Sequence, residues 1–382
     1  MSGAALVLNE EERLLRDTAR EFLQSHAPVA ALRRLRDTRD ELGYTPDLWR
    51  RMVELGWASI MLPEQYGGLD FGFRGLGVVL EECGRTLAAS PLFATTVVGA
   101  SAILLGGSEQ QRATLLPEIA QGGLTLALAL EESHHHRPNH IATTAEARGD
   151  GFILNGRKTF VLDGHSADRL IVVARSDGDV DSQTGLTLFM VHPMTEGVIR
   201  ERTIMADSRN AANIRFDNVA VGADSVLGTV NAGHEILEPV LDRGRVAIAA
   251  EMMGLALEAF ERTVAYLKER RQFDAPIGSF QALQHRAALM QAELELARSV
   301  LLAALSAVDR TPQQLPLLAS LAKARLNELV KLVTNEAVQM HGGIGVTDEL
   351  EIGFFLKRAR VAMQVFGDTG FHKDRYATLC GY

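Results

Sequence analysis

Hydrophobic positions recur at helical spacing through the first third of the chain. Within Glu10–Ser25 the apolar residues lie three or four positions apart, and Asn9 is a candidate N-cap. The same spacing returns in Thr45–Leu55, which has Pro46 in its first turn, where proline is well tolerated. The pattern predicts an all-helical N-terminal domain over residues 1–121.

After residue 121 the pattern changes to short apolar runs. Gly123–Leu130 is the first of them, and others follow at intervals of roughly 8–15 residues. Turn sequences such as Gly149-Asp150-Gly151 and Asn155-Gly156 separate these runs. Short strands joined by such turns are typical of an antiparallel sheet, so we expect a compact β domain over residues 122–230.

Helical spacing returns at Ala232 and continues to the end of the chain. The first stretch, Ile236–Arg271, is long for a globular helix, and its apolar stripe suits a helical bundle. Together the patterns predict an α+β protein whose C-terminal domain, residues 231–382, is a four-helix bundle. Three more helices are expected to complete that bundle, over residues 279–308, 312–339 and about 348–366.

Composition limits the classes of function. The chain has 382 residues, of which 47% are hydrophobic and 23% charged, as in a soluble globular protein. A net charge of −9 argues against a nucleic-acid partner. No apolar run is long enough for a membrane span, and no signal peptide is visible. Because Cys83 and Cys380 are the only cysteines, we expect a reducing compartment, the cytoplasm.

A break in the helical pattern carries candidate chemistry. Residues 274–278, with Pro276 and Gly278, interrupt the pattern, and Ser279 is a plausible N-cap for the helix that follows. Arginines and phenylalanines gather at this corner: Arg270, Arg271, Arg286, Phe273 and Phe280. Such a corner can hold a phosphate against cations and offer a ring to a purine. An ordinary helix–loop–helix with a solvated basic face explains the local pattern equally well.

Two motifs resemble those of one enzyme family. Residues 266–281 contain Tyr-x3-Arg-x2-Phe-x2-Pro-Ile-Gly-x-Phe-Gln, which resembles the signature of the acyl-CoA dehydrogenase family. Residues 339–347, QMHGGIGVT, are similar to that family's C-terminal glycine motif. The rest of the chain fits the family's layout of a helical domain, an antiparallel β domain and a four-helix bundle.

The resemblance implies FAD as the cofactor. Arg270 would hold the FAD diphosphate, since a guanidinium is always charged and donates two parallel hydrogen bonds. Phe273 would lie against the adenine, and Gln281 is a further polar candidate beside the diphosphate.

The glycine motif would line the same diphosphate. Gln339, Gly342 and Gly343 are its candidate residues, because glycines let backbone N–H groups approach an anion closely. Taken alone, His341-Gly342-Gly343 would be read as a helix C-cap turn. In the family the two motifs meet the flavin across a subunit interface, so a homo-oligomer (dimer or tetramer) or a hetero-oligomer with a related subunit is expected.

The β domain would cover the flavin ring. The backbone at Leu130 and Glu131 would bond to the pyrimidine edge of the ring, although Glu131 stands where the family has threonine. In residues 155–164, Phe160 replaces the tryptophan that lies against the flavin. Leu162 replaces a threonine that donates a hydrogen bond at flavin N5, and leucine has no donor.

A histidine-rich loop replaces the family's glycine-serine-aspartate loop. Residues 134–140 contain four histidines, which invites a metal interpretation. Structural zinc usually uses cysteine or a helical histidine spacing with supporting groups around it. We therefore expect a polar loop and no metal.

The resemblance assigns substrate contacts to the long helix. Asp242 and Arg245 would contact the CoA portion of an acyl-CoA, and Gly244 leaves space beside the thioester. That space weakly favours a branched or bulky acyl group. The alternative is an ion pair between residues three apart on the surface of a bundle.

The catalytic base is missing from both positions that the family uses. Dehydrogenation needs a carboxylate that removes the α-proton while the β-hydrogen leaves as hydride. The glutamate that usually follows the last helix aligns with Phe366 or Gly367, and the other known position is Gly244. Asp368 is the nearest carboxylate and our candidate base, with Thr369 beside it assigned to the cofactor. Asp368 could instead be a cap or turn residue.

The resemblance thus implies FAD-dependent α,β-dehydrogenation of an acyl-CoA thioester in lipid or acyl-CoA catabolism, with an electron-transfer flavoprotein as acceptor. One alternative is a non-catalytic FAD-binding subunit of a heteromeric acyl-CoA dehydrogenase. Another is a flavin oxidase of the same fold.

Overall fold

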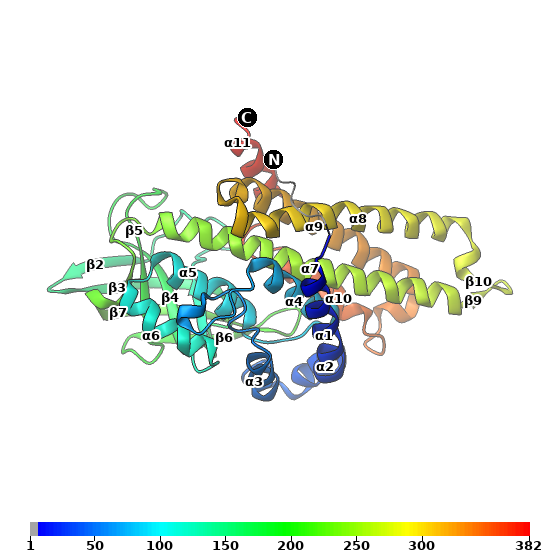
Figure 1. The fold of residues 1–382 in the computed structure, drawn as a ribbon, viewed down its shortest axis with the longest axis horizontal. Coiled ribbons are helices and arrows are strands. Elements are labelled where there is room, and N and C mark those ends of the chain that lie inside the picture. The colour runs from blue at the N-terminus through cyan, green and yellow to red at the C-terminus, as the bar shows by residue number, and fades with distance from the viewer. Residues whose placement is uncertain (1–6) are drawn as a thin grey trace. The chain divides into compact units, whose positions relative to one another are not determined.

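A computed structural model describes residues 7–382 of the chain (Figure 1). The chain forms two compact units. One comprises the chain up to Thr38 with Phe73–Ala89 and Arg245–Tyr382, and the other comprises Arg39–Gly72 and Ser90–Gly244. The order along the chain is helices, then a sheet, then helices, so the predicted architecture is confirmed.

Strands and short helices make up the unit of Arg39–Gly72 and Ser90–Gly244. Its helices are α3 (Pro46–Glu54), η1 (Glu64–Tyr66), the π-helix η2 (Phe93–Gly99), α5 (Ala100–Gly106), α6 (Glu109–Ala120) and η3 (Ala223–Ser225). Ser108 begins α6 with a capping box, in which its side chain accepts from the Gln111 N–H and the Gln111 side chain accepts from the Ser108 N–H.

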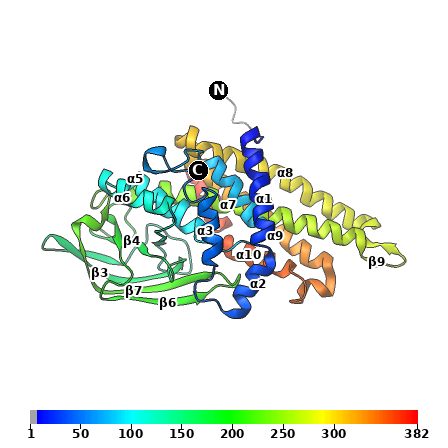
Figure 2. The same ribbon diagram turned by 60° about the horizontal axis from the view of Figure 1, so that its bottom comes forward.

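The sheet of this unit has eight strands in the order β6-β7-β3-β2-β4-β5-β8, with β1 paired to β4. The strands are β1 (Leu126–Ala129), β2 (Thr144–Arg148), β3 (Gly151–Leu162), β4 (Arg169–Arg175), β5 (Leu186–Val191), β6 (Val198–Ile204), β7 (Asn210–Gly222) and β8 (Val226–Leu227). Figure 2 shows β3, β7 and β6 side by side. A buried apolar cluster that includes Leu154, Phe189 and Phe216 forms the core of the sheet region.

The sheet departs from the prediction at two places. It is mixed, because β1 and β2 both pair with β4 in parallel, whereas the sequence suggested an antiparallel sheet. Asn155-Gly156 is no hairpin turn, since β3 runs through it with a bulge against β7 between Leu154 and Gly156. Gly156 has a φ of +149°, and a side chain there would collide with Thr143.

Helices build the other unit. It contains α1 (Glu10–His26), α2 (Val29–Thr38), α4 (Phe73–Thr86), most of α7 (His234–Glu269), α8 (Gln281–Arg310), α9 (Leu315–His341), α10 (Ile352–Ala362) and α11 (Thr369–Leu379). The four predicted bundle helices are α7–α10, although α10 ends earlier than expected. Sequence analysis missed α11, which begins after a tight turn at Phe366 and Gly367.

Glycines allow α4 and α7 to cross at close range. A Cβ atom on Gly84 would lie 1.9 Å from the carbonyl oxygen of Glu251, and one on Gly254 would lie 1.7 Å from that of Glu81. Any larger residue would therefore force the two helices apart. Among the helices of residues 7–382, none is long and apolar enough to cross a membrane.

Candidate functional site

The arginine-rich corner is a short hairpin between α7 and α8. Its strands are β9 (Arg271–Gln272) and β10 (Ala275–Pro276), and η4 (Ile277–Ser279) follows. Phe273 and Asp274 form its turn with φ angles of 53° and 60°. Phe273, in this left-handed turn, is 89% exposed. The hairpin thus presents a large aromatic face to whatever binds there.

Tyr266 and His341 join this corner to the glycine motif. Their ring centroids lie 4.4 Å apart, and the Tyr266 hydroxyl donates to the carbonyl oxygen of His341 at 3.3 Å. The His341 ring is buried, with Nδ1 2.7 Å from the carbonyl oxygen of Ala337, and burial lowers the pKa of His341. Tyr266 and His341 are 75 positions apart in the chain, so the fold brings the two motifs into direct contact.

The glycine motif leaves its backbone open. It continues as η6 (Gly342–Val346), and Gly342 has a φ of +67°. A Cβ atom built on Gly342 or Gly343 would meet nothing within 4 Å. Space beside a glycine backbone is what a diphosphate needs in order to approach its N–H groups.

The polar residues assigned to FAD have unused donors. Arg270, Gln281 and Gln339 are exposed, and their side chains make no hydrogen bond or ion pair with any residue in 7–382. A guanidinium, two amides, an exposed ring and an open glycine backbone fit the diphosphate and adenine of FAD. The residues present at this corner thus match the chemistry of the cofactor.

In the sheet unit, a buried lysine fixes the end of β1. Lys158 donates from Nζ to the Leu130 carbonyl oxygen at 3.0 Å and to Glu132 Oε1 at 2.7 Å. Glu132 also accepts from the N–H groups of Ala142 and Thr143. Burial lowers the pKa of Lys158 to about 8, against the opposing effect of Glu132. Sequence analysis did not identify this set of contacts around Lys158. The signal that could have found it was a charged lysine within an otherwise strand-like pattern.

Glu131 is also held in place. Its carbonyl oxygen accepts from the Thr159 N–H at 2.8 Å, and its Oε1 lies 2.5 Å from Nδ1 of His136. Phe160 has a φ of 53° where the register of β3 shifts against β7, and both Phe160 and Leu162 are half-buried. Within residues 7–382, the histidines of the loop join no cluster that could hold a metal ion.

The substrate candidates on α7 are buried. Asp242 is 2% exposed and Arg245 is fully buried, so the surface placement in the ion-pair alternative is wrong. The guanidinium of Arg245 donates from Nε to the carbonyl oxygen of Phe366 at 3.3 Å. Arg245 therefore supports the turn at Phe366–Gly367, the segment where the family's usual glutamate is missing.

Asp368 caps a helix. It is the N-cap of α11, its Oδ1 accepts from the Phe371 N–H at 2.9 Å, and the residue is exposed. Thr369 is the first residue of that helix. The cap interpretation of Asp368 is thus present in the structure, whereas its assignment as a base stays a prediction.

The turn before Asp368 has little room for a larger residue at position 367. Gly367 has a φ of +116°, and a Cβ atom there would lie 2.5 Å from Cδ1 of Phe371 and 2.7 Å from Nε2 of His372. The carbonyl oxygen of Gly367 accepts from Nζ of Lys323 at 3.0 Å. Burial and the nearby Arg245 lower the pKa of Lys323. The sequence signal for Lys323 was a lone lysine on the buried face of its helix.

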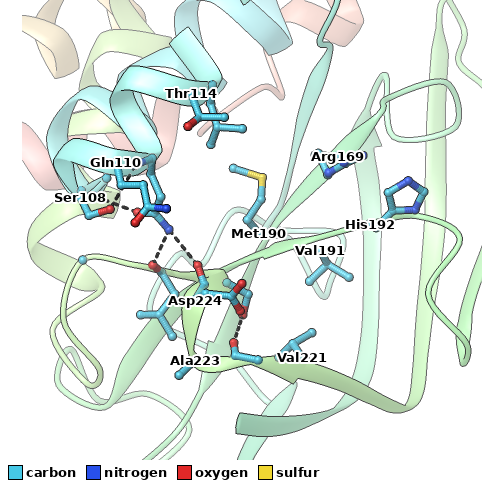
Figure 3. A pocket seen from close by; sticks show the side chains of 18 of the residues that line it. Ser108, Gln110, Thr114, Arg169, Met190, Val191, His192, Val221, Ala223 and Asp224 are labelled. Atoms are coloured by element: carbon cyan, nitrogen blue, oxygen red, sulfur yellow. Dashed lines mark hydrogen bonds between the residues drawn. The ribbon is translucent and has the colours of Figure 1, made fainter. Parts of the chain in front are cut away.

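A recess lies in another part of the sheet unit, away from the residues assigned to cofactor and substrate (Figure 3). It has a volume of about 850 Å³ and lies between the start of α6 and the ends of β5 and β7. Gln111 bridges its floor by donating to the carbonyl oxygens of Asp224 and Val226. None of the residues assigned to cofactor or substrate lines this recess.

Family profiles match the chain along most of its length. "Acyl-CoA dehydrogenase, N-terminal domain" matches residues 9–123, the "middle domain" matches 127–219, and the "C-terminal domain" matches 231–378.

Similar proteins agree with these profiles. "Acyl-CoA dehydrogenase IpdE2" of Mycolicibacterium smegmatis is 32% identical, over 94% of this chain and 96% of that protein. "3-(aryl)acrylate reductase" of Clostridium sporogenes is 31% identical, over 93% of this chain and 94% of that protein. The solved structure of a variant of the "Tcur3481-Tcur3483 steroid ACAD" is 32% identical with a TM-score of 0.88, over 97% of this chain and 98% of that one. The chain therefore belongs to the acyl-CoA dehydrogenase family, whose members are FAD-binding oxidoreductases acting on CH–CH groups.

Proposed function

We propose that this chain takes part in the FAD-dependent α,β-dehydrogenation of an acyl-CoA thioester. The observation that carries the proposal is the contact between the two family motifs through Tyr266 and His341, with the donors of Arg270, Gln281 and Gln339 unused around it. When bound, FAD would supply the acceptor for the hydride that leaves the β-carbon. Arg270 and the backbone of Gly342–Gly343 would hold its diphosphate.

Other residues would orient the flavin and the substrate without taking part in the chemical step. Lys158 keeps the Leu130 carbonyl and Glu132 in place, so the backbone at Leu130 and Glu131 is ordered before any ring binds against it. Phe160 would offer an aromatic face to that ring, and Leu162 would place an apolar side chain where the family has a donor. Asp242, Gly244 and Arg245 are our candidates for contacts with the substrate.

The geometry favours one form of this function, a subunit that depends on a related chain for the base. Asp368 already accepts the Phe371 N–H as a helix cap, and Gly367 has no space for a larger side chain. Neither position that the family uses for glutamate carries a carboxylate in this chain. One solved relative, at 32% identity, carries a name that joins two proteins, "Tcur3481-Tcur3483". We propose by analogy a hetero-oligomer, with a homo-oligomer as the alternative.

Flavin reduction tests this proposal. The purified protein should show a flavin absorbance spectrum, and an acyl-CoA should bleach it under anaerobic conditions. Reduction by the chain alone would support Asp368 as its base, whereas reduction only after mixing with a related chain would support the subunit form. A colourless protein that takes up no FAD would contradict both.

The remaining partners follow from the same proposal. We propose an electron-transfer flavoprotein as the electron acceptor, and peroxide formation in its absence would indicate an oxidase instead. The cysteines Cys83 and Cys380 are free thiols, which supports a reducing compartment such as the cytoplasm.

A further inference from the structure

Two arginines face each other on the sheet. In the register of β3 and β7, Arg157 lies directly opposite Arg215, and Ile199 of β6 lies on the other side of Arg215. Both arginines are exposed. Residues opposite each other in an antiparallel pair have Cβ atoms about 4.5–5.5 Å apart, so two guanidinium groups share one small region of the surface.

This arrangement is unfavourable without a further partner. Like charges directly opposite each other destabilise a sheet. Within the described part of the chain, neither guanidinium makes a hydrogen bond or an ion pair. The pair therefore has positive charge and donor groups that the chain itself does not use.

The neighbouring carboxylates only partly offset this charge. Glu132 is engaged by Lys158 Nζ and by the N–H groups of Ala142 and Thr143. Glu201, opposite Asn213 one step along the same face, is the other carboxylate nearby, and it is exposed. One uncompensated carboxylate against two guanidinium groups leaves the region positive.

An open cavity on the sheet includes both arginines in its lining. It has a volume of about 620 Å³ and includes Arg157, Arg215 and Glu201 in its lining. Ser133 and His134, from the loop after β1, form another part of the wall. Thr159 donates from its hydroxyl to Asn213 Oδ1 on the floor. The cavity thus combines two guanidinium groups, an imidazole and hydroxyl groups, the side chains that recognise phosphate.

We propose that Arg157 and Arg215 form the floor of a binding pocket for a phosphate or diphosphate group. Two guanidinium groups on adjacent strands can each donate paired hydrogen bonds to one anion, which would also remove their mutual repulsion. Under the proposed function the chain meets two such ligands, the CoA portion of the thioester and FAD. The choice between these two sources rests on that function, whereas the pocket's affinity for phosphate does not.

Calorimetry with inorganic pyrophosphate tests the pocket. Pyrophosphate is titrated at low salt into the FAD-loaded and the stripped protein. It should bind to both forms if the pocket serves the substrate and to the stripped form alone if it serves FAD, and R157Q or R215Q should weaken that binding by about 10-fold or more. R148Q is the matched control, since Arg148 is an exposed arginine of β2 outside the cavity lining, and it should bind as the native protein does. E201Q should tighten binding, because it removes the carboxylate that opposes the anion.

Three further titrations identify the source of the phosphate. CoA and dephospho-CoA are titrated into the FAD-loaded protein, and FAD is titrated into the stripped protein. Loss of CoA affinity alone in R215Q assigns the pocket to the substrate, and loss of FAD affinity alone assigns it to the cofactor. Both outcomes support a phosphate pocket. Affinities for pyrophosphate, CoA and FAD within twofold of R148Q in both variants would overturn it.

These measurements need no turnover, so they remain valid if the chain proves unable to dehydrogenate an acyl-CoA. The variants should also stay folded, because each removes one of two repelling charges from the surface of the sheet. An unfolding temperature equal to or above that of the native protein checks this point. A lower one in both arginine variants, beyond that of R148Q, would show that the pair stabilises the sheet and would contradict the reasoning.

Discussion

Substitutions at Asp368 separate a helix cap from a catalytic base. The Asp368 carboxylate accepts the Phe371 N–H at 2.9 Å and is exposed, so its main structural contribution is that of an N-cap, beside a smaller electrostatic effect that raises the pKa of Lys323. Asparagine and serine cap helices about as well as aspartate, whereas alanine costs about 1 kcal/mol. D368N and D368S should therefore unfold within a few tenths of a kcal/mol of the native protein. D368A should lose about 1 kcal/mol, or roughly 2 °C in Tm for a chain of this size.

Activity gives the second readout. General base catalysis contributes roughly 10²–10⁴-fold, so removing a true base should slow flavin reduction by that factor in D368N. We expect instead that D368N reduces its flavin at the native rate, measured by stopped flow in whatever assembly the native protein forms. A loss of roughly 100-fold or more in D368N with an unchanged Tm would refute the cap-only role. An unchanged Tm in D368A would refute the cap itself.

Three other substitutions test separate parts of the structure. K158M removes the cation from the half-buried carboxylate of Glu132, which keeps its two backbone N–H donors, and should cost up to roughly 3 kcal/mol in urea unfolding. Recovery of stability in K158M/E132Q would confirm that the pair is the cause. The pKa of Glu132 is lowered in the folded protein, so ionised Glu132 should stabilise the fold at any pH above its unfolded pKa. That stabilisation should be lost as the pH falls through the folded pKa, and E132Q should remove this part of the pH dependence of stability. G367A should destabilise by roughly 1–3 kcal/mol through its positive φ and its contacts, whereas G370A in the first turn of α11 should not; equal effects would contradict the packing of the turn. R270Q should weaken FAD binding by about 10-fold or more without lowering the stability of the stripped protein, and unchanged affinity would remove Arg270 from the cofactor site.

The sequence predicted the three-part order because each part has its own hydrophobic period. The resemblance predicted that residues 266–281 and 339–347 meet the flavin across a subunit interface. The structure joins the two motifs within one chain through Tyr266 and His341, and their shared flavin site stays a prediction. The sequence could not predict the parallel pairing of β1 with β4, because strands so distant in the chain leave no local pattern of their pairing. For the same reason, Asn155-Gly156 looked like a turn although it is a bulge within a long strand.

The functional details that the sequence missed depend on register and burial. Nothing in the local pattern showed that Arg157 faces Arg215, because that fact needs the alignment of β3 with β7. Sequence analysis made no prediction for Lys158 and Lys323, yet both are buried and donate to backbone carbonyl oxygens. Asp368 was open to two roles, and only the geometry of α11 shows that it caps the helix.

Anaerobic reduction of the bound flavin by an acyl-CoA tests the central claim most directly. A panel of acyl-CoA thioesters, including branched and bulky ones, is mixed with the purified protein, alone and together with a related chain from the same source. We predict that the flavin absorbance band bleaches for at least one thioester when the related chain is present, and weakly or not at all without it. A protein that binds no flavin, or a flavin that no acyl-CoA reduces in either mixture, would contradict the account.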